Sequence, residues 1–117
     1  MSFRSTLVDK EGIRHISVTG RLDSATSGEF ERSLDGIFGV DAARAVMDLK
    51  GLDYISSAGL RVVLMIAKRI KQANGRMIIC GLQPNVRQVF EISGFLKILD
   101  VADDLDAAKA KLAGTAS

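Results

Sequence analysis

The chain has 117 residues, 47% of them hydrophobic and 26% charged, with a formal net charge of +2. This composition predicts one globular domain with a single hydrophobic core and excludes a disordered chain. Basic residues are scattered and aromatic residues make up only 5%. We therefore expect no nucleic-acid binding, which uses a basic stripe and stacking aromatics.

The first predicted elements are two strands, over residues 3–8 and 13–18, joined into a hairpin by a turn at 10–12. A helix over residues 25–38 follows, opened by Asp23 and Ser24. Its apolar stripe comprises Phe30, Leu34, Ile37 and Phe38.

The middle of the chain predicts a buried strand over residues 45–49, which leads into a tight loop. A long helix starts at Ser57, and Asn74-Gly75 ends it. A second buried strand spans residues 76–80. The apolar face of the long helix carries Leu60, Val63, Leu64, Ala67 and Ile70.

The last predicted elements are a short helix over residues 85–93, begun by Pro84 and closed by Gly94, and a strand over residues 96–101. A final helix begins at Asp103-Asp104. Its apolar residues are Leu105, Ala108 and Leu112. Strands that alternate with helices favour a mostly parallel sheet with right-handed crossovers.

Two reactive residue types occur once each. Cys80 lies in an apolar run and is expected to be a buried small hydrophobe, and a single cysteine suits a reducing cytosol. His15 has no Cys or His neighbour at metal-ligand spacing, so we predict a surface strand position and no metal or cofactor. Because no long apolar segment or signal peptide is present, we expect a cytoplasmic protein without direct membrane insertion.

Ser56 and Ser57 stand where the tight loop meets the long helix. A serine oxygen at a helix start accepts hydrogen bonds from unpaired backbone N–H groups. The same groups and the helix dipole attract an anion such as a phosphoryl group. The junction is therefore either a helix cap, which spacing alone favours, or a place where a serine carries phosphate.

Catalysis by either serine is not predicted. A serine nucleophile needs an adjacent base that a third group orients, and His15 has no evident orienting acid. The chain also lacks G-x-S-x-G, Walker A and dinucleotide fingerprints. We therefore expect no catalytic residue and no enzyme activity.

The long helix also suggests a docking face. Steps of three or four residues from Ser57 place Arg61, Met65 and Lys68 on one side. Adaptable Met side chains recur at protein-binding surfaces. The alternatives are a docking face centred on Ser57 and an exposed methionine without a role.

Three segments stand out in chain order: VTGRLD at 18–23, DLKGLDYISSAGLRVVL at 48–64 and GRMIICGLQPNVRQVFEISG at 75–94. In this order they resemble the signature of STAS domains, the family of bacterial anti-sigma factor antagonists. Together they cover most of the chain from about residue 16 to 101. The resemblance implies an α/β fold, a four- to five-stranded mixed, mostly parallel sheet with helices mainly on one side. It implies a STAS domain over residues 1–113, and we expect a flexible tail over 114–117.

The family motif runs Asp, Ser, Ser or Thr, Gly or Ala, Leu, and its first serine is the phosphoacceptor. Aligning Gly59-Leu60 with the end of the motif places Ser57 at the acceptor, with Ser56 at the aspartate. The resemblance thus implies that Ser57 is phosphorylated, with Ser56 as the second candidate. Asp23 aligns with a family aspartate near the acceptor, and it is also a candidate N-cap.

The resemblance implies a partner-switching protein in transcription regulation. Its partner would be a serine kinase of the histidine-kinase-like ATPase class that is also an anti-sigma factor, and a PP2C-type phosphatase would reset the cycle. The predicted partner-binding residues are Asp23, Ser56, Ser57, Arg61, Met65 and Lys68. The alternative is a non-switching STAS subunit of a membrane transport complex.

Overall fold

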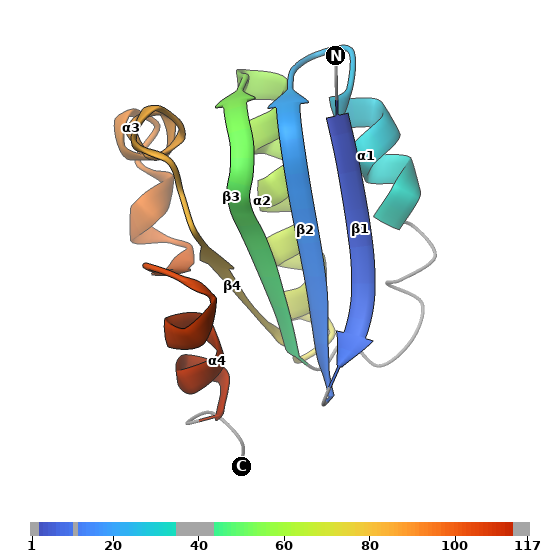
Figure 1. Ribbon diagram of the computed structural model, residues 1–117, viewed down its shortest axis with the longest axis vertical. Coiled ribbons are helices and arrows are strands. Elements are labelled where there is room, and N and C mark those ends of the chain that lie inside the picture. The colour runs from blue at the N-terminus through green and yellow to red at the C-terminus, as the bar shows by residue number, and fades with distance from the viewer. Residues whose placement is uncertain (1–2, 11, 35–43, 114–117) are drawn as a thin grey trace.

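The computed structural model describes residues 3–10, 12–34 and 44–113, which form a five-stranded sheet and its helices (Figure 1). In chain order the elements are β1 (Phe3–Lys10), β2 (Ile13–Leu22), α1 (Ser27–Leu34), β3 (Arg44–Ile55), α2 (Ser57–Gln72), β4 (Arg76–Cys80), α3 (Pro84–Ile92), the short 3₁₀ helix η2 (Phe95–Lys97), β5 (Asp100–Ala102) and α4 (Leu105–Ala113). No helix among these residues is long and apolar enough to cross a membrane.

The strands lie in chain order, β1-β2-β3-β4-β5. Among the strands that the structure describes, only β1, which forms the hairpin with β2, is antiparallel to its neighbour, and the other three pairs are parallel. Gly12 makes the hairpin turn at φ +78°, a left-handed conformation that glycine adopts without steric cost. The predicted α/β fold with a mixed, mostly parallel sheet is confirmed.

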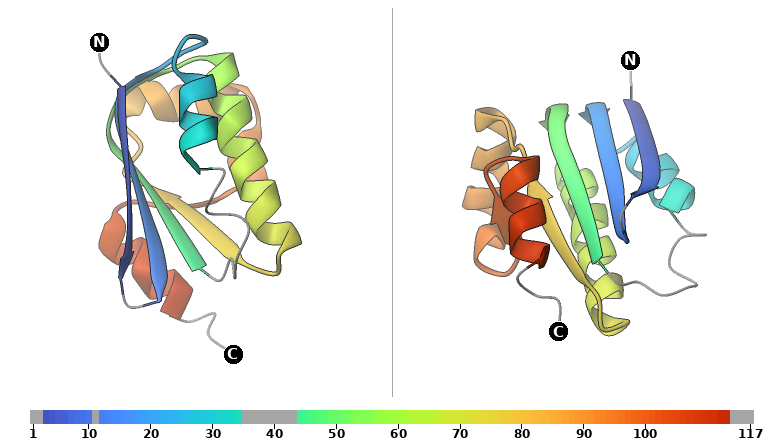
Figure 2. Two further views of the ribbon diagram at one scale, coloured as in Figure 1. Left: turned by 90° about the vertical axis from the view of Figure 1, so that its right-hand side faces the viewer. Right: turned by 60° about the horizontal axis from the view of Figure 1, so that its bottom comes forward.

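Helices lie on both faces of the sheet (Figure 2), and an apolar core fills the space beneath them on each face. The larger core lies between the sheet and α1, α2 and α3, and the smaller lies under α4. Successive side chains of a strand point to opposite faces. In β3, Val46 therefore packs in the smaller core and Met47 in the larger. A strand buried on both faces has a nearly continuous run of apolar residues, and such a run predicted the first half of β3.

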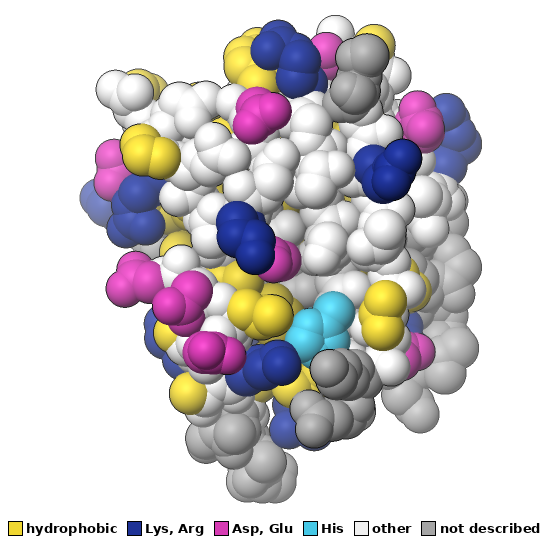
Figure 3. All heavy atoms as spheres, in the orientation of Figure 1, with side chains coloured by type: hydrophobic (Ala, Val, Ile, Leu, Met, Phe, Trp, Pro, Cys, Tyr) yellow, Lys and Arg dark blue, Asp and Glu magenta, His cyan; other side chains and the backbone are white. Residues whose placement is uncertain are grey.

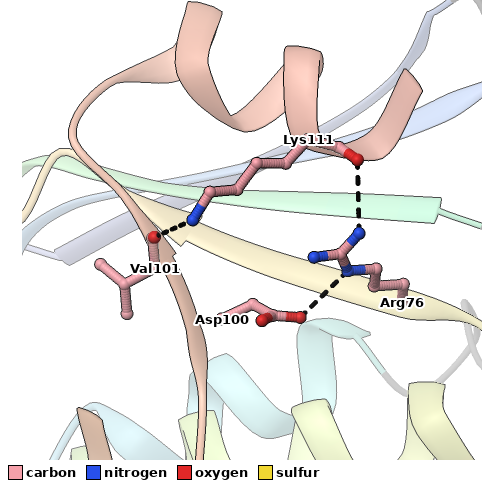
Figure 4. A network of polar contacts seen from close by, with 4 residues as sticks. All are labelled: Arg76, Asp100, Val101 and Lys111. Carbon is pink, nitrogen blue, oxygen red and sulfur yellow. Dashed lines mark hydrogen bonds and ion pairs between the residues drawn. The ribbon is translucent and has the colours of Figure 1, made fainter. Parts of the chain in front are cut away.

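Helix α4 is attached to the last two strands by apolar packing and a polar network (Figure 4). Arg76 Nε donates to Asp100 Oδ2 at 3.0 Å, and Arg76 Nη1 donates to the Lys111 carbonyl at 3.3 Å. Lys111 Nζ in turn donates to the Val101 carbonyl at 2.7 Å. Exposed polar contacts stabilise little, so the fully buried Ala108 and Leu112 supply most of the attachment.

Strand β3 does not end at residue 49, and the predicted tight loop is wrong. Its second half stays extended and pairs with an equally prolonged β2, Thr19 opposite Gly51 and Arg21 opposite Tyr54. The strands approach closely at Gly51, where a Cβ would lie 2.5 Å from Thr19 Cγ2. This half lies beyond the end of β4, and the side-chain amide of Asn85 donates to the Asp53 carbonyl there at 2.6 Å.

The predicted strand over residues 96–101 is also wrong in its first half. Gly94, at φ +77°, ends α3, and the backbone N–H groups of Ile98 and Leu99 both bond to the Phe95 carbonyl. These bonds keep the chain coiled in η2, so β5 begins only at Asp100. The helix predicted over residues 25–38 begins at Ser27, and its residues 35–38 lie outside the described residues, as does the predicted tail.

Candidate functional site

The start of α2 is fixed against the end of β2. The Ser56 N–H donates to the Leu22 carbonyl at 2.9 Å. Gly59, in the first turn of the helix, lies against the same residue, because a Cβ there would come within 2.7 Å of Leu22 O and 2.8 Å of Leu22 Cγ. A glycine at this position therefore lets the serines of α2 lie close to the residues that follow β2.

The two serines of the junction have different surroundings. Ser56 is the N-cap of α2, with extended backbone angles, and its Oγ accepts the Gly59 N–H at 3.2 Å. Ser57 is the first residue of the helix and is exposed. Within the described part of the chain, its hydroxyl has no hydrogen-bond partner. Ser56 thus caps the N-terminus of α2, and the Ser57 hydroxyl is left available to another molecule.

Asp23 directly follows Leu22 and caps the turn that leads into α1. Its Oδ1 accepts the N–H groups of Ala25 at 3.0 Å and Thr26 at 3.1 Å. Thr26 Oγ1 accepts the Asp23 N–H at 2.9 Å, which completes a reciprocal capping box. The Thr26 N–H makes the largest contribution to lowering the pKa of the Asp23 carboxyl, and the positive charge of Arg21 adds a smaller one.

Arg21 and Tyr54 form a pair at this corner that the sequence reasoning missed. They are neighbours across β2 and β3, and the guanidinium carbon of Arg21 lies 4.2 Å from the centroid of the Tyr54 ring. At this distance the cation is attracted to the ring face. The pair would have been found only if both strands had been extended to their true ends.

The polar residues of the predicted docking face of α2 lie at the surface as expected, but the outward placement of Met65 is wrong. Ser57, Arg61 and Lys68 are exposed, whereas Met65 is half-buried and packs against the larger core. Leu64, which we expected in the core, is only half-buried. At 3.6 residues per turn it falls about 20° from Ser57 around the helix axis, so it belongs to the Ser57 stripe.

The remaining titratable candidates lie away from this corner. Cys80 is fully buried as predicted, and burial, followed by the charges of Asp48 and Asp104, raises the pKa of its thiol to about 12. His15 is half-buried on β2. Within the described ranges no group of three His, Cys, Asp or Glu side chains is placed to hold a metal ion.

The sheet face opposite α1 and α2 offers no comparable site (Figure 3). The charged and hydrophobic side chains visible on this face are scattered, and those of the described residues form no large apolar patch there. A hollow of about 550 Å³ lies where α4 begins, and its lining includes four acidic residues, Asp48, Asp103, Asp104 and Asp106. We take the start of α2 as the candidate site, because the exposed Ser57 begins the helix there and Ser56 bonds it to Leu22, directly before Asp23.

Fold and site together define a small α/β domain that presents a serine hydroxyl at the start of a helix beside its sheet. The chain belongs to the STAS domain family, whose family model matches residues 5–108.

Known relatives agree in sequence and fold. The chain is 46% identical over 100 residues to BtrV of Bordetella bronchiseptica, provisionally named an anti-sigma factor antagonist, with 86% of each chain covered. The crystal structure of an anti-sigma factor antagonist from Mycobacterium paratuberculosis superposes with a TM-score of 0.85 at 21% identity, covering 95% of this chain and 94% of that one.

Two solved structures of SpoIIAA, one unphosphorylated and one phosphorylated, are similar to this chain in fold. The anti-sigma factor antagonist SpoIIAA in its unphosphorylated form matches with a TM-score of 0.75 at 22% identity, covering 99% of this chain and all of that one. The phosphorylated form of SpoIIAA from Bacillus matches with a TM-score of 0.64 at 21% identity, covering 86% and 91%.

Proposed function

We propose that this chain is an anti-sigma factor antagonist, a cytoplasmic binding module without catalytic activity of its own. When Ser57 is unphosphorylated, the chain binds a serine kinase that also serves as an anti-sigma factor. That kinase, of the histidine-kinase-like ATPase class, transfers phosphate from ATP to Ser57 and so ends the interaction. A PP2C-type phosphatase restores the binding form.

The observation that carries this proposal is that the hydroxyl groups of the two serines have different surroundings. Ser56 provides the cap, so its hydroxyl is engaged with the Gly59 N–H. Ser57 is exposed at the first position of the helix, where a kinase can reach it. This difference favours Ser57 over Ser56 as the acceptor.

Phosphorylation at this position should act on the interface and spare the fold. A phosphoserine carries up to two negative charges at neutral pH, and the start of a helix stabilises negative charge. The exposed positions that share its stripe, Arg61 and Lys68, would form part of the docking face. A partner that approaches this face would have to desolvate the phosphate, which weakens binding. The two solved states of SpoIIAA support such a switch by analogy.

The test is incubation with the cognate kinase and ATP, followed by mass mapping of the phosphate. Ser57→Ala should abolish phosphorylation and keep kinase binding, because Ser56 still caps the helix. Ser56→Ala is the matched control, which should lose about 1 kcal/mol of stability with its cap and still accept phosphate. Full phosphorylation of the Ser57→Ala protein would show that the acceptor is misassigned.

Calorimetry with Ser57→Asp tests the switch itself. The variant should bind the kinase more weakly than the wild type, although less weakly than the phosphoprotein does, since Asp carries one charge. Equal affinities would refute the switch and favour a permanent STAS subunit of a transport complex.

A further inference from the structure

A second hollow of the molecule lies at the end of α2 that is opposite to Ser57. Its volume is about 520 Å³, and the residues that line it come from the last turns of α2, the start of β4 and the segment that joins η2 to β5. Lys71 is one of them, and at 1.5 Å of rise per residue it lies about 20 Å along the helix axis from Ser57. This hollow is therefore separate from the candidate site.

Positive charge predominates among the described residues that line the hollow. They include one acidic residue, Asp100, and four basic ones, Arg44, Lys71, Arg76 and Lys97. Asp100 is already paired, because Arg76 Nε donates to its Oδ2 at 3.0 Å (Figure 4). The C-terminal end of α2 adds about half a negative charge, but the N–H groups of residues 73–75 already bond to its last carbonyls. The hollow therefore keeps a net positive charge.

Two of the four basic side chains are held by other parts of the chain. Arg76 also donates to the Lys111 carbonyl, and the guanidinium of Arg44 lies beside the hairpin turn, where a Cβ on Gly12 would be 3.3 Å from Arg44 Nη2. Lys71 and Lys97 are exposed, and neither forms an ion pair with another described residue. Their ammonium groups are thus available to an anion in the hollow.

The remaining lining of the hollow is largely apolar. Ala67, Met77 and Leu99 belong to the larger core or pack against it, so they line the inner side. Ile98, by contrast, is 70% exposed. A single exposed apolar side chain needs no explanation by itself, but this one borders a recess that also presents Lys97. A ligand that covered Ile98 would remove apolar surface from water.

We propose that this hollow binds a small organic anion, in which a phosphate or carboxylate is carried on a short apolar body. Lys71 and Lys97 hold the anionic group through charge-assisted hydrogen bonds, and Ile98 covers the apolar part. The volume of the hollow falls within the range of about 300–1,000 Å³ that small-molecule sites occupy. Because the hollow is far from Ser57, this binding does not presuppose the proposed function.

The experiment titrates the ¹⁵N-labelled protein with hexyl phosphate and follows the backbone amides by NMR. Hexanol and inorganic phosphate are the reference ligands, since each supplies only one half of the probe. Hexyl phosphate should cause saturable shifts at residues 71–76 and 97–100. It should bind about tenfold more tightly than either reference ligand, because it gains both the ionic contacts and the apolar burial.

Substitutions separate the two halves of the site. Lys97→Met should weaken hexyl phosphate by about threefold or more. Ile98→Ser should weaken hexyl phosphate as well, but it should leave the affinity for inorganic phosphate unchanged. The matched controls are Lys68→Met and Ile92→Ser, which remove the same groups from exposed positions outside the lining. Both control variants should bind hexyl phosphate like the wild type.

Three outcomes would overturn the proposal. The first is that hexyl phosphate causes no saturable shift at residues 71–76 and 97–100. The second is that Lys68→Met weakens binding as much as Lys97→Met, which would show a general attraction of anions to surface lysines. The third is that the protein sediments with phosphatidylglycerol vesicles and yet does not bind hexyl phosphate, which would assign the basic residues to a membrane surface.

Discussion

Substituting Gly59 by alanine tests whether the close approach of α2 to β2 builds the site. Gly59 is buried in the first turn of α2. An added Cβ would stand 2.7 Å from the Leu22 carbonyl oxygen, 2.8 Å from Leu22 Cγ and 3.1 Å from Ile55 Cγ1. The carbonyl is backbone, and both side chains belong to the larger core. None of these atoms can move without disturbing its neighbours, so the helix start itself must shift.

Two effects of opposite sign decide the size of the change. Alanine in place of glycine in a helix stabilises it by about 1 kcal/mol. Overpacking a well-packed interior costs about 1–3 kcal/mol, and contact with a backbone oxygen places this site at the upper end. We therefore expect Gly59→Ala to lower the free energy of unfolding by about 1–2 kcal/mol, or the melting temperature by roughly 4–8 °C.

Gly28→Ala is the matched control in a thermal-unfolding assay. Gly28 lies in α1, and among the described residues an added Cβ would have only the flexible Arg32 Nη1 nearby, at 3.4 Å. The same substitution should therefore stabilise the protein there, by up to about 1 kcal/mol. If both variants gained stability, the contact between Gly59 and Leu22 would be looser than described, and the reasoning about the start of α2 would fail.

Two further predictions concern the core. Val63→Glu should unfold the domain, because Val63 is fully buried. Met65→Glu should lower the melting temperature by a smaller amount, since position 65 is half-buried and a glutamate there can turn its carboxylate toward water. Equal losses of melting temperature in the two variants would refute this ranking. The thiol pKa of Cys80, raised from 9.0 to about 12, leaves about a thousandfold less thiolate at pH 8. Iodoacetamide should therefore label native Cys80 far more slowly than guanidinium-unfolded protein, and similar rates would show that the thiol is accessible.

The parts of the fold that local patterns determine were predictable. Asn74-Gly75 ends α2 as expected, because Asn74 adopts φ +65° and the Gly75 N–H bonds to the Ile70 carbonyl at 2.8 Å. Gly94 ends α3 in the same left-handed conformation. These signals depend on single residues and their immediate neighbours, so they are legible without the tertiary structure.

The second half of β3 could not be predicted in this way. Gly51 and Asp53 are turn residues by local preference, and only pairing with β2, distant in the sequence, keeps them extended. The Arg21–Tyr54 pair depends on that same register, so it was missed together with the strand.

Leu64 and Met65 show a different limit. The apolar residues of α2 cover a wide arc, and adjacent residues differ by about 100° around the axis. Which of the two faces outward depends on the helices that pack beside α2, which a periodic pattern does not specify.

The departure of this chain from the family motif changes the charge near Ser57 more than it changes the fold. The motif has an aspartate where this chain has Ser56. Aspartate and serine are equally good N-caps, and Ser56 makes the capping bond to the Gly59 N–H. A serine, however, places no negative charge beside Ser57, so a phosphate there meets less repulsion from its neighbour. In this respect Ser56 makes the start of α2 more favourable to a doubly charged phosphate at Ser57 than the aspartate of the family motif would.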